Sequence, residues 1–80
     1  MIDNINIGEA IKKKMEEDGR KVSWLAEKIN CNRNNIYRIY EKKHLDTELL
    51  LKICVHLEID LFSLYSQQIN EEIHKKGGKT

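Results

Sequence analysis

The sequence of 80 residues contains no proline and only four glycines, at positions 8, 19, 77 and 78. Because proline and glycine interrupt helices most strongly, their scarcity leaves long stretches that can stay helical. Strict alternation of apolar and polar residues between turn signals, the pattern of a half-buried strand, does not occur either. These absences predict an all-α chain in which short turns connect the helices.

The sequence also lacks the signals of secretion, membrane insertion and catalysis. It has only two cysteines, and its first residues form neither a basic nor an apolar leader segment. No apolar run approaches the ~20 residues that span a bilayer. Phosphate loops, metalloprotease motifs, nucleophile elbows and metal-binding cysteine or histidine spacings are all missing. We therefore expect a cytoplasmic protein that is not an enzyme, binds no metal or cofactor and has no membrane partner.

Charge is unevenly distributed along the chain. Between Arg20 and Lys43, seven basic residues are opposed by only two acidic ones, so this segment carries a net charge of +5. The whole chain has a net charge of +1, which leaves −4 for the remainder. Taken alone, this asymmetry fits either a phosphate-binding face or a chance fluctuation in a lysine-rich chain.

Apolar residues recur at helical spacing and predict one domain of five helices. These helices are expected over residues 7–17, 22–29, 33–42, 47–57 and from about residue 60 onward. Asn32 and Asp46 stand where the third and fourth helices need N-caps, and Gly19 can end the first helix in the left-handed conformation. We expect the domain to cover residues 1–66. A polar tail over residues 67–80 should be helical at first and then disordered.

The second and third predicted helices form the most informative unit, because only about three residues connect them. With Ile36 and Ile39 facing inward, the third helix presents Arg33, Asn34 and Arg38 outward. Arginine can pair bidentately with guanine, and asparagine with adenine, in the major groove of DNA. Three asparagines near the start of this helix are more than a cap requires. We interpret the helix as one that reads DNA, the plainer alternative being a capped and solvated helix face.

Five short motifs follow one another along the chain. They are IG (7–8), LAEKI (25–29), CNRNNI (31–36), LLKIC (50–54) and DLFSL (60–64). In this order and spacing, residues 7–65 resemble the phage-repressor (Cro-like, or XRE) helix-turn-helix family. The segments VSWLA (22–26), YRIY (37–40) and DTELL (46–50) look closest to a Bacteroidetes branch of small proteins of this type. The resemblance implies a five-helix bundle of the lambda-repressor-like DNA-binding type and a sequence-specific transcriptional regulator.

The resemblance also implies roles for individual residues. Base contacts fall on Arg33, Asn34 and Arg38. Contacts to the DNA backbone fall on Arg20, Lys21, Ser23, Asn32, Asn35, Tyr37, Lys42 and Lys43. A two-fold homodimer is expected, because one helix-turn-helix buries too little for tight binding and two copies read half-sites about 34 Å apart. Its interface is expected at residues that could equally cap the monomer core, namely Phe62, Leu64, Tyr65, Ile69 and Ile73.

The chain departs from the family pattern at two places. Val22 stands where members usually have a glutamine that holds the DNA backbone, and Tyr40-Glu41-Lys42 replaces a glutamate–glycine pair. Arg20, Lys21 or Ser23 is expected to replace the glutamine. The departures keep two alternatives open: a protein-interaction module that has lost DNA binding, and an antitoxin that binds both DNA and a toxin. Because the sequence contains no sensor domain, we expect no small-molecule effector.

Overall fold

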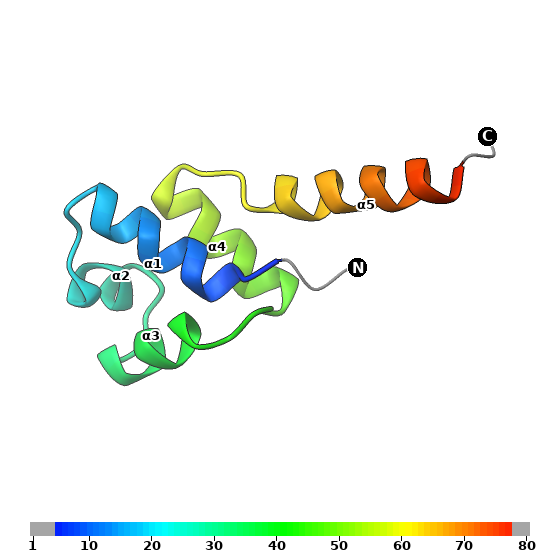
Figure 1. The fold of residues 1–80 in the computed structure, drawn as a ribbon. Helices are drawn as coiled ribbons and strands as arrows, with labels where there is room; N and C mark the ends of the chain where they lie inside the picture. Colours follow the sequence, from blue (N-terminus) through cyan, green and yellow to red (C-terminus); the bar gives the residue numbers. More distant parts are fainter. Residues whose placement is uncertain (1–4, 78–80) are drawn as a thin grey trace.

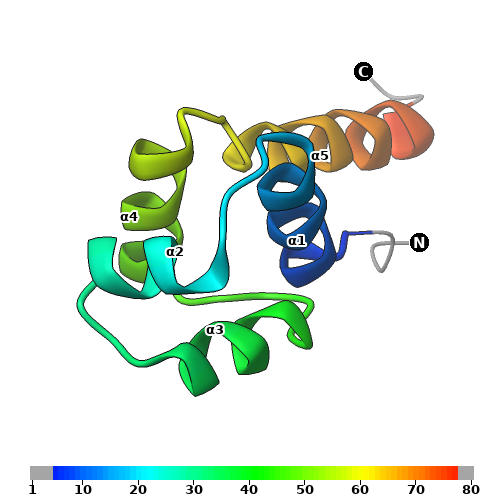
Figure 2. The same cartoon turned by 90° about the vertical axis from the view of Figure 1, so that its left-hand side faces the viewer.

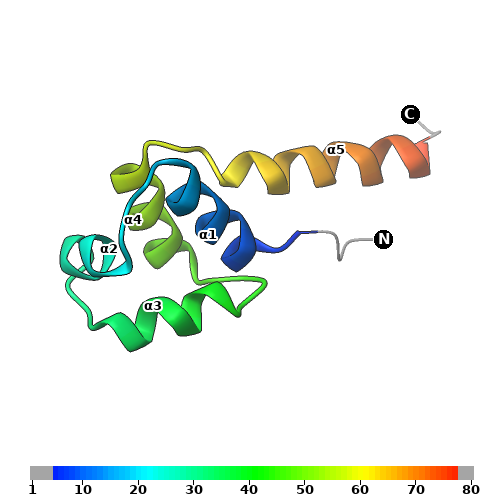
Figure 3. The ribbon, with the colours of Figure 1, turned by 60° about the vertical axis from the view of Figure 1, so that its left-hand side comes forward.

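Five helices make up the regular structure of residues 5–77, the part of the chain that the computed structural model describes. In chain order they are α1 (Ile7–Glu17), α2 (Val22–Lys28), α3 (Arg33–Tyr40), α4 (Thr47–Leu57) and α5 (Phe62–Gly77). The first four form a bundle, and α5 leads away from it toward the C-terminus (Figure 1). The helix α3 lies on the side of the bundle away from α5 (Figures 2 and 3). The predicted all-α class is confirmed.

Side-chain caps start three of the helices. Asn6, Asn32 and Asp46 each accept a hydrogen bond from the backbone N–H three residues further on, at 3.1, 3.1 and 2.9 Å. These bonds satisfy N–H groups that have no partner within the helix. The predicted caps Asn32 and Asp46 are confirmed. Gly19 follows α1 in the predicted left-handed conformation, with a φ of 66°.

Replacing Asp46 with alanine is expected to lower the free energy of unfolding by about 1 kcal/mol, the usual cost of a lost N-cap. The substitution removes the bond from the N–H of Leu49 and leaves that donor to solvent. Chemical denaturation followed by circular dichroism measures the loss. Asp46→Asn keeps an acceptor and should retain most of the stability. Equal losses in both variants would show that the charge at the helix start, rather than the hydrogen bond, stabilises α4.

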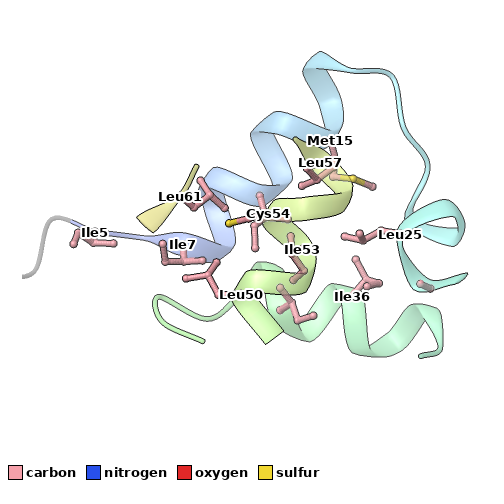
Figure 4. Packing of buried hydrophobic residues seen from close by; sticks show 13 residues of the cluster. Ile5, Ile7, Met15, Leu25, Ile36, Leu50, Ile53, Cys54, Leu57 and Leu61 are labelled. Atoms are coloured by element: carbon pink, nitrogen blue, oxygen red, sulfur yellow. The ribbon is translucent and has the colours of Figure 1, made fainter. Parts of the chain in front are cut away.

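The core lies where the four helices of the bundle meet. Side chains of α1 and α4 face one another, and Leu25 of α2 and Ile36 of α3 complete the packing (Figure 4). The largest fully buried side chains are Ile7, Ile11, Met15, Leu25, Ile36, Leu50 and Ile53. The predicted apolar stripes therefore meet in one cluster. Because the buried residues of α3 are Ile36 and Ile39, its opposite face is left to solvent.

The start of α1 is joined directly to the chain that follows α3. The backbone N–H groups of Ile7 and Gly8 donate to the carbonyl oxygens of Lys43 and Lys42, both at 2.8 Å. A Cβ atom on Gly8 would lie within 3.0 Å of three backbone carbonyl oxygens at the end of α3 and just beyond it. Only glycine lets the two backbones approach this closely. The junction therefore fixes where α3 sits on the bundle.

The same junction explains why α3 is shorter than expected. The helix ends at Tyr40, and the expected end at residue 42 is wrong, because the backbone at Lys42 and Lys43 turns to meet α1. The fifth helix begins at Phe62 and runs without a break past residue 66, where the polar tail was expected to start. Disorder is expected over residues 77–80 at the end of the chain, but Gly77 still belongs to α5, and residues 78–80 lie outside the described residues.

Candidate nucleic-acid interface

Residues 29–32 connect α2 and α3 in a tight turn. The backbone N–H of Cys31 donates to the carbonyl of Ala26 at 2.8 Å and closes the end of α2. Asn30 adopts a φ of 59°, a left-handed conformation that asparagine tolerates better than most residues. The cap Asn32 then starts α3. Together these features make α2, the turn and α3 a helix-turn-helix unit (Figure 2).

The helix α3 has one buried and one exposed face. Ile36 is fully buried and Ile39 is 5 % exposed. The predicted base-contacting residues Arg33, Asn34 and Arg38 are all exposed. Their spacing of one, four and five residues places them on one side of the helix, opposite the isoleucines. The structure thus brings the three predicted side chains together on the outer face of α3.

Tyr37 lies on this same outer face and is 54 % exposed. Its ring meets that of Tyr40 edge to face, with centroids 6.2 Å apart and planes at 86°. Burial raises the pKa of Tyr40 above its ordinary value, and the neighbouring Tyr37 and Glu16 add to the rise. The outer face of α3 combines two guanidinium groups, an amide and a phenol, all suited to hydrogen bonding with DNA.

Most of the predicted contacts to the DNA backbone lie near the two ends of α3, whereas Tyr37 lies in the middle of the helix. At one end, a surface groove brings the start of α2 together with the start of α3. Four predicted backbone contacts line this groove, namely Arg20, Lys21, Ser23 and Asn32, and the predicted base contact Arg33 lines it as well. At the other end, Lys42 and Lys43 are exposed, while their carbonyls are held by α1. Asn35 differs from the rest, because it is half-buried and sits between the two faces of α3.

A stack between Arg20 and Trp24 lies in the same groove and was not predicted from the sequence. The guanidinium carbon of Arg20 is 4.2 Å from the ring centroid of Trp24. The spacing of four residues between an arginine and a tryptophan was the available signal. The contact was not predictable from this spacing alone, because Arg20 precedes α2 and the helical period does not fix the direction of its side chain.

His44 connects the segment after α3 to α5. Its Nδ1 atom lies 2.8 Å from the hydroxyl oxygen of Tyr65, and the ring centroids are 5.8 Å apart. Burial raises the pKa of Tyr65 above its ordinary value. The hydrogen bond ties α5 to the loop that carries Lys42 and Lys43.

The residues predicted for a dimer interface fall into two groups. Phe62, Leu64 and Tyr65 are half-buried and pack against the core of the monomer. Ile69 and Ile73, further along α5, are 56 % and 57 % exposed. They line an apolar groove with Ile5, His44, Tyr65, Gln68 and Glu72. Phe62, Leu64 and Tyr65 thus cover the core of the monomer, and a dimer interface at Ile69 and Ile73 stays a prediction.

Within residues 5–77, no three histidine, cysteine, aspartate or glutamate side chains gather closely enough to hold a metal ion. No helix in that range combines the length and the apolar character needed to span a membrane.

Comparison with known proteins agrees with this geometry. The profile of the Cro/C1-type HTH DNA-binding domain matches residues 10–65, which include α2, α3, α4 and most of α1. No curated protein and no solved structure matches the chain, so the resemblance to a Bacteroidetes branch gains no support. The match confirms the predicted lambda-repressor-like class and the Cro-like family. The chain therefore belongs to the family of Cro/C1-type helix-turn-helix DNA-binding domains.

Proposed function

We propose that the protein is a sequence-specific transcriptional regulator that reads the major groove of double-stranded DNA with α3. The observation that carries this proposal is the division of α3 into an anchored and an exposed face. Ile36 and Ile39 hold the helix to the bundle, and the opposite face presents Arg33 and Arg38. The major groove, about 12 Å wide, admits an α-helix presented in this way.

Bases and phosphates are contacted by different residues in this proposal. Arg33, Asn34 and Arg38 select bases through paired hydrogen bonds to guanine or adenine. Basic groups at both ends of α3 neutralise phosphates and make the affinity depend on salt. They include Arg20 and Lys21 at one end and Lys42 and Lys43 at the other.

The protein acts as a homodimer in this proposal, with the outer part of α5 as the contact surface. Ile69 and Ile73 lie one helical turn apart, and each exposes more than half of its surface. Exposed apolar residues on a protruding helix lower their free energy when they are buried against the same face of a second copy. Such a dimer would place two copies of α3 on successive half-sites, about 34 Å apart. The protein works in the cytoplasm and needs no small-molecule effector.

Selection from a random duplex library, followed by fluorescence anisotropy at two salt concentrations, tests the function. We expect one enriched sequence motif and binding that weakens steeply as salt rises. Without salt-dependent binding at micromolar protein, the proposal fails. The second candidate, an interaction module or antitoxin component, would then be preferred. It is favoured by the apolar pair Leu51 and Val55 on α4, which are 55 % and 63 % exposed and are not among the residues proposed to contact DNA.

Replacing Lys42 with alanine is expected to weaken binding to cognate and random duplex alike and to reduce the salt slope by about 1. The side chain is exposed, and the carbonyl and N–H of Lys42 remain able to make their bonds to Gly8 and Ile39. Folding should therefore be unaffected, which circular dichroism verifies. A loss confined to the cognate duplex would assign Lys42 to base recognition instead.

A further inference from the structure

Two basic side chains lie over the ring of Trp24, and they differ in their distance from the ring and in their surroundings. The guanidinium carbon of Arg20 lies 4.2 Å from the ring centroid, and the ammonium nitrogen of Lys28 lies 6.0 Å from it. A cation over the face of a tryptophan is attracted by the negative charge of that face. Arg20 is the closer of the two, and a planar guanidinium also stacks on aromatic rings.

Only one of these two cations lines the groove between the starts of α2 and α3. Arg20 and Trp24 both line it, and so does the predicted base-contacting residue Arg33, whereas Lys28 does not. Lys21 adds a further positive charge to the groove, and Glu27 adds one negative charge. The excess of positive charge makes an anion the fitting ligand for the groove. Val22, the first residue of α2, is half-buried and apolar and offers such a ligand no side-chain donor.

On the basis of the function proposed above, we propose that Trp24 is a positioning residue that holds Arg20 ready for a DNA backbone phosphate. A free arginine side chain must give up rotamer freedom when it binds a phosphate. An arginine already stacked on a ring gives up less, and its N–H donors still point outward in the plane of the guanidinium group. Trp24 thus acts through Arg20 and makes no contact with DNA of its own.

A double-substitution cycle tests this coupling. Binding to the selected duplex is compared for the unsubstituted chain, Arg20→Ala, Trp24→Leu and the double variant. We expect Trp24→Leu to weaken binding about twofold to fivefold when Arg20 is present, in line with an exposed cation–π contact. In the Arg20→Ala background, the same substitution should have no further effect. A tryptophan that only supports the fold would weaken both backgrounds equally, and that result would overturn the proposal.

Lys28→Ala is the matched control for charge. It removes one positive charge from the same ring but from outside the groove. Arg20→Ala should reduce the salt slope by about 0.9, the value for one phosphate contact on duplex DNA, and Lys28→Ala should leave the slope unchanged. Equal changes in the two variants would overturn the proposal, because they would mean that net charge alone explains the effect.

Trp24 also permits a test that leaves this residue in place, should Trp24→Leu fail to fold. It is the single tryptophan of the chain, so its fluorescence reports on the groove. Adding duplex should change the emission of the unsubstituted protein along the same titration curve as the anisotropy, and should leave that of Arg20→Ala nearly unchanged. Equal changes in both proteins would overturn the proposal. Failure of the unsubstituted protein to bind any duplex would instead overturn the proposed function itself.

Discussion

Replacing Gly8 with alanine is expected to lower the free energy of unfolding by about 3 kcal/mol or more, from overpacking and from loss of a hydrogen bond. Helix propensity alone predicts the opposite, a gain of about 1 kcal/mol, because alanine is the better helix former. The steric clash of the new Cβ atom outweighs this gain, so the net effect on the free energy of unfolding is a loss. The new Cβ would lie within 3.0 Å of three backbone carbonyl oxygens, and backbone atoms held in place cannot move aside as a flexible side chain can.

The backbone hydrogen bonds made at this position add to the loss of stability. Moving α1 outward to relieve the clash would stretch the bonds from the N–H groups of Ile7 and Gly8 to the chain that follows α3. That chain includes Lys42 and Lys43, so the substitution should also weaken DNA binding in whatever fraction remains folded. Thermal unfolding followed by circular dichroism measures the effect, with an expected fall in Tm of roughly 12 °C or more for a domain of this size.

Gly19→Ala is the matched control. A Cβ atom there meets nothing within 4 Å, so only the left-handed φ of 66° opposes the substitution. The expected loss is about 1 kcal/mol. If Gly8→Ala were as mild as Gly19→Ala, or stabilising, the close contact between α1 and the end of α3 would not be present in solution.

Local signals in the sequence were sufficient for most of the fold. The bounds of α1 and α4 agree with the predicted ones. Each helix has an apolar stripe with a period of 3.6 residues and a signal at one terminus, namely Gly19 after α1 and the cap Asp46 before α4. The caps Asn32 and Asp46 were predictable for the same reason, since a cap acts on an N–H only three residues away.

Features that depend on residues distant in the sequence were not predictable. Gly8 belongs to a motif that carries the family resemblance, but the reason for a glycine there lies in the carbonyl oxygens near the end of α3, more than thirty residues along the chain. The contact between His44 and Tyr65 spans 21 residues. One local feature was not predictable either: Glu58 ends α4 with a φ of 54°, a left-handed conformation in which glycine is the usual residue. No pattern in a single sequence predicts contacts or conformations of this kind.

The candidate site also has one part that was predictable from the sequence and one part that was not. That Arg33, Asn34 and Arg38 point outward follows from helical period once Ile36 and Ile39 are placed in the core. The grouping of Arg20 with Arg33 in one groove depends on how α2 crosses α3. Helical period carries no information on that crossing. The individual roles in DNA contact stay predictions, and the most direct test of them concerns Arg33.

Replacing Arg33 with alanine is expected to cost about 1–3 kcal/mol in binding to the selected duplex and to relax specificity at one base pair. Arg33 is the first residue of α3 and is exposed, which suits a side chain that reaches base edges where the helix enters the groove. Binding to random duplex should fall much less, because phosphate contacts elsewhere supply that affinity. Anisotropy titrations against the selected duplex and against single-base variants of it measure both effects.

Arg33→Lys separates base recognition from charge. Lysine keeps the positive charge, so the salt slope should stay close to that of the unsubstituted protein. Lysine cannot form the paired, planar hydrogen bonds that a guanidinium makes to guanine, so discrimination at the affected base pair should fall nearly as far as in Arg33→Ala. If Arg33→Ala weakened binding to all duplexes equally and left the discrimination between bases unchanged, Arg33 would be a phosphate contact. Base recognition would then rest on Asn34 and Arg38, one and five residues further along the same face of α3.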